Sequence, residues 1–280
     1  MKKLALAIAL LLAVRAMCAD DGPGPNGDER APDLRVATFN IENYPKSQRQ
    51  IVGAFDILRE LQPAAVGVQE ITRPAMFARD ARVALGPTWA FAHCRDCQVQ
   101  RVGVLFDSAR LRLLSTTTHR DTEAYAKAKP AFEARLQDQT DGRIVRILVV
   151  HLKAGGDHAE TRKRQLRGLR RVVDRVRRHG EPVILLGDFN ATGDADRLQL
   201  ARLADATGLQ WVTRSLSCTS YWARDDGCLG TALDHIFSTN PLLSVAARGP
   251  CESVGCRPGA SCPRFHGDVS DHCPVTAELP

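Results

Sequence analysis

Residues 183–192 read V-I-L-L-G-D-F-N-A-T, an apolar run that ends at a glycine and is followed by two polar residues. Four consecutive apolar residues before a glycine predict a short strand that is buried on both faces. Asp188 and Asn190 stand at the carboxyl end of this strand, and alternate residues of an extended chain point the same way. We therefore expect both side chains to project into one space, where a carboxylate and a carboxamide can hold a water molecule and a phosphate oxygen together.

Short apolar strands and amphipathic helices alternate along the rest of the chain. The predicted strands are 35–39, 64–68, 102–106, 111–114, 144–150, 183–186, 233–237 and 274–277, and the predicted helices are 47–61, 161–178 and 195–206. The strands 102–106 and 111–114 are expected to form a hairpin. No repeat or mid-chain linker interrupts the 280 residues, so we expect one layered α/β domain. Polar groups recur where strands end, which is where α/β sheets place their sites.

The N-terminal segment is predicted to lie outside this domain. Two lysines precede an apolar run over residues 4–14 and two small residues, which is the order of a secretory signal peptide over 1–19. The alternative is an amphipathic first helix of the domain. Residues 20–33 are rich in Gly, Pro and Asp and are predicted to be a flexible lead-in. No later segment approaches the length of a membrane span, so we expect a secreted or periplasmic protein without a transmembrane segment.

Cysteine usage agrees with export. Eight of the nine cysteines follow the predicted signal peptide, and an even set in an exported chain predicts disulfide bonds. Connectivity cannot be read from the sequence. The pairs Cys94–Cys97 and Cys218–Cys228 would close short loops and are the local candidates. A redox or zinc half-site is the alternative for the first pair, but no second C-x-x-C is present.

Six segments share one design, in which a buried strand ends in a carboxylate, an amide or an imidazole. They are T-F-N-I-E-N at 38–43, V-Q-E at 68–70, H-L-K at 151–153, G-D-F-N at 187–190, L-D-H-I-F at 233–237 and S-D-H-C-P-V at 270–275. Together and in this order they resemble the endonuclease/exonuclease/phosphatase family, which includes deoxyribonuclease I, abasic-site endonucleases, neutral sphingomyelinases and inositol-polyphosphate phosphatases. The resemblance implies one domain over 34–280 with a four-layer α/β/β/α sandwich, in which two mixed sheets pack together and helices lie outside.

The resemblance implies a metal-dependent phosphoesterase. Hydrolysis of a phosphate ester requires the anion to be neutralised so that water can approach phosphorus, and Mg²⁺ held by one or two carboxylates does this. Glu70, at a strand end, is the predicted ligand, and Asn40 can supply a neutral oxygen beside it. The resemblance adds Asp271. Mn²⁺ and Ca²⁺ are the alternative ions, and a solvated loop carboxylate is the alternative role for Glu70 taken alone.

The remaining motif residues are assigned to proton and phosphate handling. By resemblance, the two histidines of the site map to His151 and His272, and Asp234 orients His272 and stabilises its charged form. Asp188 and Asn190 then position and activate the attacking water and bind the phosphate. Which of Asp188, His151 and His272 takes the proton stays open.

Three further residues have weaker assignments. Many members of the family contact phosphate with an arginine before the H-L-K strand, and the corresponding stretch here offers Lys129, a point charge without the bidentate fork of arginine. His235 follows Asp234 directly and would face the opposite way in a strand, so we interpret it as a structural neighbour. Glu42 shares a side with Asn40, and either a place near the metal or a surface role fits it.

Charge and aromatic content bear on the substrate. Without the basic residues of the predicted signal peptide the formal charge falls from +6 to +3, which is weak support for a nucleic-acid partner. The helix 161–178 carries nine basic residues, and such a stripe would either attract a polyanion or form a solvated outer face. Aromatic residues are only 5%, which leaves little material for base stacking. Three of them, Trp211, Tyr221 and Trp222, precede Asp234 and could flank the cleft.

These observations rank three functions. The first is an exported Mg²⁺-dependent phosphodiesterase that cuts DNA or RNA and acts as a monomer without a stable protein partner. The second is the same chemistry on a phospholipid, sphingomyelin or phosphomonoester, and the lipid version predicts an exposed apolar hairpin. The third is a non-catalytic secreted binding protein or toxin subunit, which would have no need for the full set of site residues.

Overall fold

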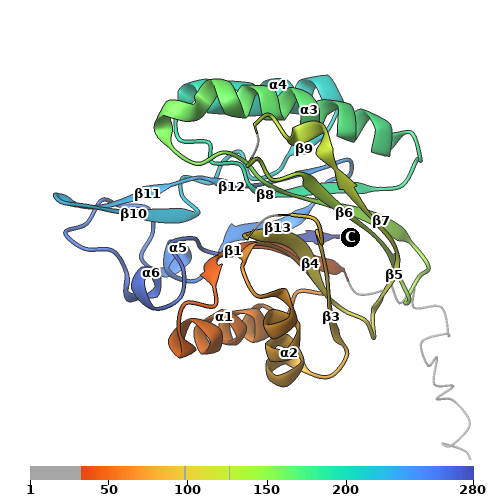
Figure 1. The fold of residues 1–280 in the computed structure, drawn as a ribbon, viewed down its shortest axis with the longest axis horizontal. Helices are drawn as coiled ribbons and strands as arrows, with labels where there is room; N and C mark the ends of the chain where they lie inside the picture. Colours follow the sequence, from red (N-terminus) through yellow and green to blue (C-terminus); the bar gives the residue numbers. More distant parts are fainter. Residues whose placement is uncertain (1–32, 98, 126) are drawn as a thin grey trace, which may run out of the picture. The chain divides into compact units, whose positions relative to one another are not determined.

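The computed structural model describes residues 33–280 apart from 98 and 126, so the predicted signal peptide and nearly all of the predicted lead-in lie outside the described residues. The described chain forms two six-stranded mixed sheets and a two-stranded ribbon (Figure 1). In spatial order the first sheet contains β13 (Leu243–Ala247), β14 (Val275–Leu279), β1 (Leu34–Tyr44), β2 (Ala65–Ile71), β4 (Arg101–Asp107) and β3 (Trp89–His93). The second contains β5 (Leu111–His119), β6 (Ala131–Asp138), β7 (Ile144–His151), β8 (Val183–Asp188), β12 (Asp234–Ser238) and β9 (Gln210–Trp211). The ribbon consists of β10 (Ser220–Arg224) and β11 (Gly227–Thr231).

The two sheets pack face to face around a core to which both contribute. Val36 and Val104 from the first sheet and Ile147 and Leu186 from the second belong to one fully buried cluster. Gly67 on β2 marks a close approach between the sheets, because a Cβ at this position would lie 2.0 Å from a methyl carbon of Leu186. A larger residue there would have to displace Leu186 or separate the sheets.

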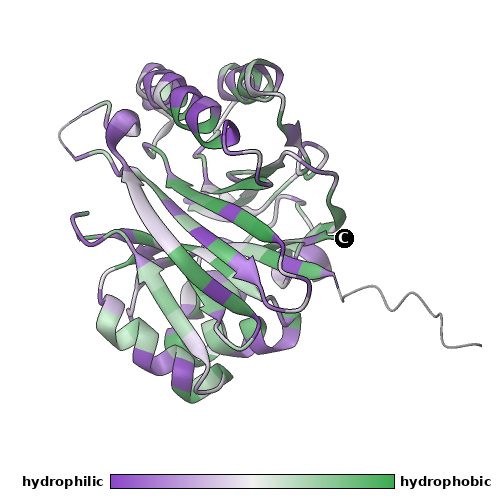
Figure 2. Ribbon diagram, turned by 90° about the vertical axis from the view of Figure 1, so that its right-hand side faces the viewer, coloured by the Kyte–Doolittle hydropathy of each residue, from purple (hydrophilic) through white to green (hydrophobic). Residues whose placement is uncertain are grey.

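Helices cover the outer face of each sheet. In Figure 1, α1 (Gln48–Leu61) and α2 (Pro74–Leu85) lie below the first sheet, and α3 (Ala159–Arg177) and α4 (Asp194–Thr207) lie above the second. The apolar face of α3 is buried against the second sheet. Figure 2 shows that the helices carry both hydrophilic and hydrophobic residues. The short helices α5 (Pro250–Ser253) and α6 (Arg264–Asp268) lie near the C-terminus of the chain. The predicted four-layer α/β/β/α sandwich is therefore confirmed.

No helix within the described residues has both the length and the hydrophobicity needed to cross a membrane. The longest, α3, has 19 residues, but it is rich in charged side chains.

Ser47 begins α1 as its N-cap by accepting a hydrogen bond from the backbone N–H of Gln50, which stabilises the start of the helix.

Two parallel strand pairs bring the motifs of the sequence to one edge of the sandwich. β1 pairs with β2 in parallel, with Asn40 opposite Gln69, and β7 pairs with β8 in parallel, with His151 opposite Asp188. The carboxyl ends of parallel neighbours lie at the same edge of a sheet. β12 runs antiparallel to β8 with Asp234 opposite Asp188, so its amino end reaches the same edge.

The hairpin predicted for 102–106 and 111–114 is wrong. Both strands exist, but β4 pairs with β2 and β3 in the first sheet, whereas β5 pairs with β6 in the second. The turn between them therefore carries the chain across the sandwich. Val104 and Leu111 both face the shared core, so the apolar pattern is satisfied from opposite sides, and the pattern alone could not tell the two pairings apart.

The eight cysteines in the described residues form four disulfides, which is typical of a protein that folds in an oxidising compartment. The Cys94–Cys97 bond is confirmed, but the Cys218–Cys228 pairing is wrong, since Cys218 bonds Cys256 and Cys228 bonds Cys262. The reason is the register of the ribbon, in which Cys228 lies opposite Ala223, five residues from Cys218. Cys218 precedes β10 and packs beside Gly230 and its bonding partner Cys256, so it does not face Cys228 across the ribbon. The fourth bond joins Cys251 to Cys273.

Candidate active site

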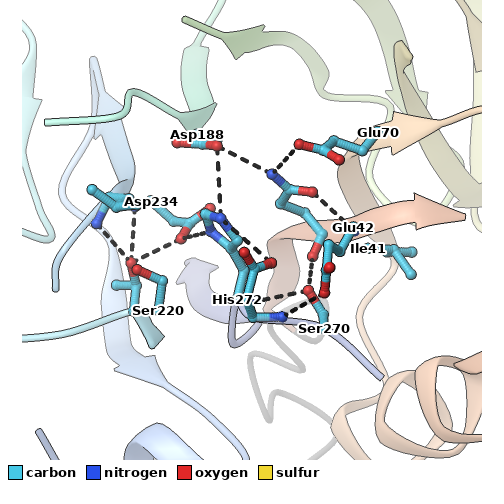
Figure 3. A network of polar contacts seen from close by, with 12 residues as sticks. Ile41, Glu42, Glu70, Asp188, Ser220, Asp234, Ser270 and His272 are labelled. Atoms are coloured by element: carbon cyan, nitrogen blue, oxygen red, sulfur yellow. Dashed lines mark hydrogen bonds and ion pairs between the residues drawn. The ribbon is translucent and has the colours of Figure 1, made fainter. Parts of the chain in front are cut away.

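The edge where the parallel strands end is hollowed by a cavity of about 320 Å³. Six of the residues predicted from the sequence line it: Glu70, His151, Asp188, Asn190, Asp271 and His272. Asn40 and Asp234 are buried and hydrogen-bond to this lining, Asn40 to Asp188 and Asp234 to His272. Figure 3 shows Asp188, Asp234 and His272 close together. The structure therefore brings together eight residues from six separate segments of the chain.

Asp234 and His272 form a buried pair. The Nδ1 atom of His272 lies 2.7 Å from a carboxylate oxygen of Asp234, and its Nε2 atom faces Asp188 at 3.8 Å. Burial alone would lower the pKa of His272, but the carboxylates of Asp234 and Asp188 outweigh it and hold the pKa well above its usual 6.5. His272 is therefore held as an imidazolium whose free N–H can point at an anion in the cavity.

Thr219 holds Asp234 in place, and no sequence motif pointed to this residue. Its hydroxyl donates to Asp234 at 2.8 Å and accepts hydrogen bonds from the backbone N–H groups of Leu233 and Asp234. Thr219 comes directly after Cys218 and before the ribbon, so its place depends on tertiary structure. A hydroxyl that accepts two backbone donors must turn its own proton toward the carboxylate, which fixes the orientation of Asp234.

Asp188 is fully buried at the centre of the site. One carboxylate oxygen accepts from the backbone N–H of Asn190 at 2.8 Å, and the other accepts from Asn40 at 3.1 Å and lies 3.5 Å from His151. Burial raises the pKa of Asp188 to about 7, against the charge of His272 and together with that of Asp234. A carboxyl group with such a pKa is typical of functional sites.

Asn190 lies beside Asp188 for a reason other than the one predicted. The strand ends at Asp188, and Asn190 has a left-handed backbone with φ of 50°. Its side chain donates to the carbonyl of Leu152 at 3.2 Å, while its backbone N–H bonds to Asp188. Both residues thus reach the cavity through a tight turn, not through alternation along a strand. Glu70 has the same unusual conformation, with φ of 62°, and such residues cluster at functional sites.

The carboxylates of Glu70 and Asp271, with the carboxamide of Asn40 beside them, form an acidic group on the other side of Asp188. Glu70 lies 3.4 Å from the Asn40 side-chain nitrogen and accepts hydrogen bonds from Asn43 and Gln100. One carboxylate oxygen of Asp271 is buried without a hydrogen-bond partner. Burial raises the pKa of Asp271, and the charges of Glu42 and Glu70 add to this effect while His272 opposes it. A group of carboxylates in which one buried oxygen accepts no hydrogen bond fits a divalent cation, which would neutralise the charge.

Other oxygen and nitrogen atoms that can bind a metal ion lie nearby. Donor atoms of Asp188, Asp234 and His272 lie within 4.8 Å of one another. Asn40 presents its amide nitrogen to Glu70 and Asp188, because its oxygen accepts from the backbone of Glu42. A half-turn of the carboxamide would present the oxygen instead. Asn40 can therefore join either a hydrogen-bonded or a cation-bound arrangement.

Glu42 links the first sheet to the S-D-H segment. It accepts a hydrogen bond from the backbone N–H of Asp271 at 3.1 Å, and Figure 3 shows Glu42 next to Ser270. Its carboxylate also pairs with Lys46 at 2.6 Å. Ser270 adds a second link by donating to the carbonyl of Asn40. Both contacts hold Asp271 against the end of β1, next to Glu70.

His151 and Lys129 complete the local charge pattern. Burial, followed by the positive charges of Lys129 and His272, lowers the pKa of His151 well below 6.5, so this histidine is neutral at pH 7. Burial lowers the pKa of Lys129, while the carboxylates of Glu70 and Asp188 oppose that effect. Lys129 does not line the cavity, but its ammonium group is close enough to both carboxylates to interact with them.

His235 faces away from the cavity, in line with the interpretation as a structural neighbour. It is fully buried, and its Nδ1 atom lies 3.3 Å from the indole nitrogen of Trp211 and 3.2 Å from the hydroxyl of Thr213. Burial lowers the pKa of His235 to about 3. Trp211 packs between this histidine and Phe237, so it does not flank the cavity.

We expect the His235→Asn variant to resist mild acid better than the wild type. Between pH 6.5 and pH 3 the unfolded chain binds a proton at this histidine that the folded chain does not, so folding stability falls as pH falls through this window. The loss is about 1.4 kcal/mol per pH unit, or about 2 kcal/mol between pH 6.5 and 5. The Asn oxygen can replace Nδ1 as acceptor and cannot be protonated. Urea unfolding of both proteins at the two pH values measures the difference, and equal acid losses would contradict a neutral buried His235.

The ribbon and the loop after the H-L-K motif supply further residues of the cavity lining. Tyr221 and Trp222 line the cavity from β10, as predicted for these two aromatics, and Trp222 is 60% exposed. The K-A-G-G stretch after the H-L-K motif contributes Gly155 and Gly156, and glycines directly after a motif strand were a signal that could have been used. The further lining residues are Ala154, Thr192, Ser220, Thr231, Leu233 and His266.

The basic stripe of α3 divides into two parts. Arg162 is buried and pairs with Asp196, so for this residue both the polyanion and the solvated-face interpretations are wrong. On the outer side, four cations line a groove between α3 and α4: Lys163, Arg167, Arg170 and Arg202. Arg171 and Arg175 pair with Asp121.

A model of the Endonuclease/Exonuclease/phosphatase family matches residues 37–272. The chain belongs to this family. No curated protein matches the sequence. The family assignment agrees with the six strand-end motifs and with the two mixed sheets between helices.

Solved structures with a similar fold align with nearly the whole chain at low sequence identity. D. rerio TDP2 in complex with a single-strand DNA product is 17% identical, with a TM-score of 0.68 over 89% of this chain and 99% of that chain. The human nocturnin catalytic domain with a bound sulfate anion is 18% identical, with a TM-score of 0.66 over 89% and 94%. The Bacteroides thetaiotaomicron mannosyl-6-phosphatase is 14% identical, with a TM-score of 0.62 over 88% and 99%. At these identities the likeness establishes the fold of this Endonuclease/Exonuclease/phosphatase family member and not its substrate.

Proposed function

We propose that this protein is an exported, metal-dependent phosphodiesterase that hydrolyses DNA or RNA. The observation that carries the proposal is the place of Asp188, a fully buried carboxylate between two groups of opposite character. On one side is the Asp234–His272 pair, and on the other is the acidic group of Glu70, Asn40 and Asp271. Structural stability does not require this concentration of buried charge, but hydrolysis of a phosphate ester does.

Each residue has a distinct task in this proposal. The Asp188 carboxylate orients the attacking water, with Asn190 beside it to bind the phosphate. His272, held by Asp234, donates a hydrogen bond to a phosphate oxygen as negative charge develops there. His151, which is neutral and 3.5 Å from Asp188, is the second candidate for the proton of the water. Glu70, Asp271 and Asn40 would hold a Mg²⁺, Mn²⁺ or Ca²⁺ ion, which supplies Lewis-acid neutralisation of the phosphate when bound.

The cavity wall favours a nucleic-acid substrate over a lipid. Trp222 presents an exposed indole at the cavity, and an indole can stack on a base. The tip of the same ribbon is charged and exposed at Arg224, Asp225 and Asp226, and an apolar membrane-docking hairpin would not carry these residues. The cationic groove between α3 and α4 adds a surface that suits a polyanion.

The test is an activity panel on purified mature protein. Single-stranded DNA, plasmid DNA, RNA, phospholipid and sphingomyelin vesicles, and small phosphate mono- and diesters are each incubated with Mg²⁺. We expect cleavage of a nucleic acid by the wild type and none by Asp188→Asn prepared in parallel, which controls for contaminating nucleases. Cleavage of only a lipid or only a phosphomonoester would reverse the substrate ranking. Failure to cleave any of them would favour the non-catalytic binding protein.

A further inference from the structure

Arg162 lies in the first turn of α3 and is almost completely enclosed, with 1% of its side chain exposed. Its guanidinium makes two hydrogen bonds to Asp196, at 2.8 and 2.6 Å, in a bidentate arrangement. The remaining donors reach the backbone carbonyls of Lys153 and Gly155, at 2.9 and 2.7 Å, and the hydroxyl of Thr192, at 3.2 Å. All five N–H donors of an arginine can be used in such an environment.

These partners belong to the two loops that form one wall of the cavity. The first loop, residues 152–156, contributes Gly155 and Gly156 to the lining, and the second, residues 189–193, contributes Asn190 and Thr192. The loops also bond directly to each other, because the Asn190 side chain donates to the carbonyl of Leu152. The guanidinium therefore lies behind the wall and joins both loops to α3 and α4.

A second anchor comes from the next turn of α3. The side-chain oxygen of Gln165 accepts the backbone N–H of Lys153 at 2.9 Å. Gln165 is also buried and does not line the cavity. Residues three apart on a helix lie on the same face, so Arg162 and Gln165 act on the same loop from one side.

We propose that Arg162, assisted by Gln165, is a positioning residue that holds both loops at the distance from Asp188 and His151 that the chemistry needs. This proposal rests on the proposed function. The planar guanidinium is essential, because it binds one carboxylate in bidentate form and at the same time donates to two carbonyls and a hydroxyl. A lysine keeps the charge but can satisfy only part of this set.

The test compares Arg162→Lys with Arg146→Lys. Arg146 is also buried, with 9% exposed, and pairs with Glu133 and Glu181 at the opposite end of β7 from His151. The variants are assayed on a small soluble phosphodiester with Mg²⁺. Circular dichroism measures the folded fraction of each sample, and kcat is calculated per folded molecule and reported together with KM. We expect Arg162→Lys to lower kcat by about 10- to 100-fold, since small displacements of reacting groups are that costly. We expect Arg146→Lys to stay within about twofold of the wild type, because its ion pairs are distant from the cavity.

The kinetic results can also decide against the proposal. Full kcat in folded Arg162→Lys would make the arginine a purely structural residue, as would an equal loss in both variants. If Arg162→Lys does not fold, Gln165→Ala replaces it, and we expect a loss of kcat in the same direction. Unchanged kcat in that variant would overturn the proposal.

A readout without turnover separates this proposal from the proposed function. Backbone hydrogen exchange in 153–156 and 190–193 is expected to be faster in Arg162→Lys than in the wild type and unchanged in Arg146→Lys. Unchanged protection in Arg162→Lys would refute the loop anchoring. A wild type without phosphodiesterase activity would instead refute the proposed function, whatever the exchange result.

Discussion

The Asp188→Asn variant is expected to lose about 10²- to 10⁴-fold in kcat, because a carboxamide cannot accept a proton or hold the attacking water by charge. The substitution preserves shape. The amide oxygen can still accept the backbone N–H of Asn190, the contact that now measures 2.8 Å. The expected loss is therefore chemical and not a consequence of misfolding. Steady-state kinetics on the substrate identified by the panel, with circular dichroism on the same sample, measures it.

His235→Asn is the matched control for this experiment. It also replaces a buried titratable residue by asparagine, on the strand that neighbours β8, but His235 faces away from the cavity. We expect it to keep the wild-type kcat at pH 7.5. Wild-type kcat in Asp188→Asn would remove Asp188 from the chemistry and leave His151 and His272 as the groups to examine.

Removal of divalent metal is expected to abolish hydrolysis, with a loss of at least about 10³-fold, because nothing else in the cavity neutralises the phosphate to the same extent. In the acidic group around Glu70, one buried oxygen of Asp271 accepts no hydrogen bond, which is the physical basis for this expectation. Dialysis against a chelator and readdition of Mg²⁺, Mn²⁺ or Ca²⁺ tests it. Hydrolysis that survives chelation would rule out the metal-dependent mechanism.

A pair of variants locates the metal within the site. Glu70→Gln is expected to raise the Mg²⁺ concentration needed for half-maximal activity by about tenfold or more, since a ligand charge is lost. Asp234→Asn is expected to lower kcat without such a shift, because Asp234 bonds to His272 and not to the proposed ligands. A shift in Asp234→Asn alone would move the metal to the Asp188, Asp234 and His272 group.

The composition of the site was predictable because each motif is local. A buried strand that ends in a polar residue places that residue at a sheet edge, whatever the rest of the fold does, and Glu70 and Asp188 were identified in this way. His151 was assigned by resemblance to the family. The position of Asn190 beside Asp188 was also predicted, but for the wrong reason. Its left-handed turn depends on the hydrogen bonds to Asp188 and Leu152, which the sequence does not display.

Features that depend on pairing between distant segments were predicted poorly. The apolar pattern of β4 and β5 fits a hairpin and a crossing between sheets equally well. The cysteines of the ribbon were paired by proximity in sequence, whereas their partners come from the segment after β13. Thr219 and Arg162 escaped notice because a threonine beside a cysteine and an arginine on a basic helix are ordinary until their neighbours are known.

By itself, the amino-acid sequence determined the layered α/β class, the order of the six motifs and the chemical character of the groups at the strand ends. These properties follow from hydrophobic periodicity and residue type, which act over a few neighbouring residues. Only the tertiary structure decided which strands share a sheet, which cysteines bond, and which charges are buried. It also decided that the guanidinium of Arg162 lies behind the cavity wall and that Asp188 lies between a histidine pair and an acidic group. Those outcomes depend on contacts between residues up to more than 200 positions apart, such as Asn40 and Ser270, and on the burial that those contacts create.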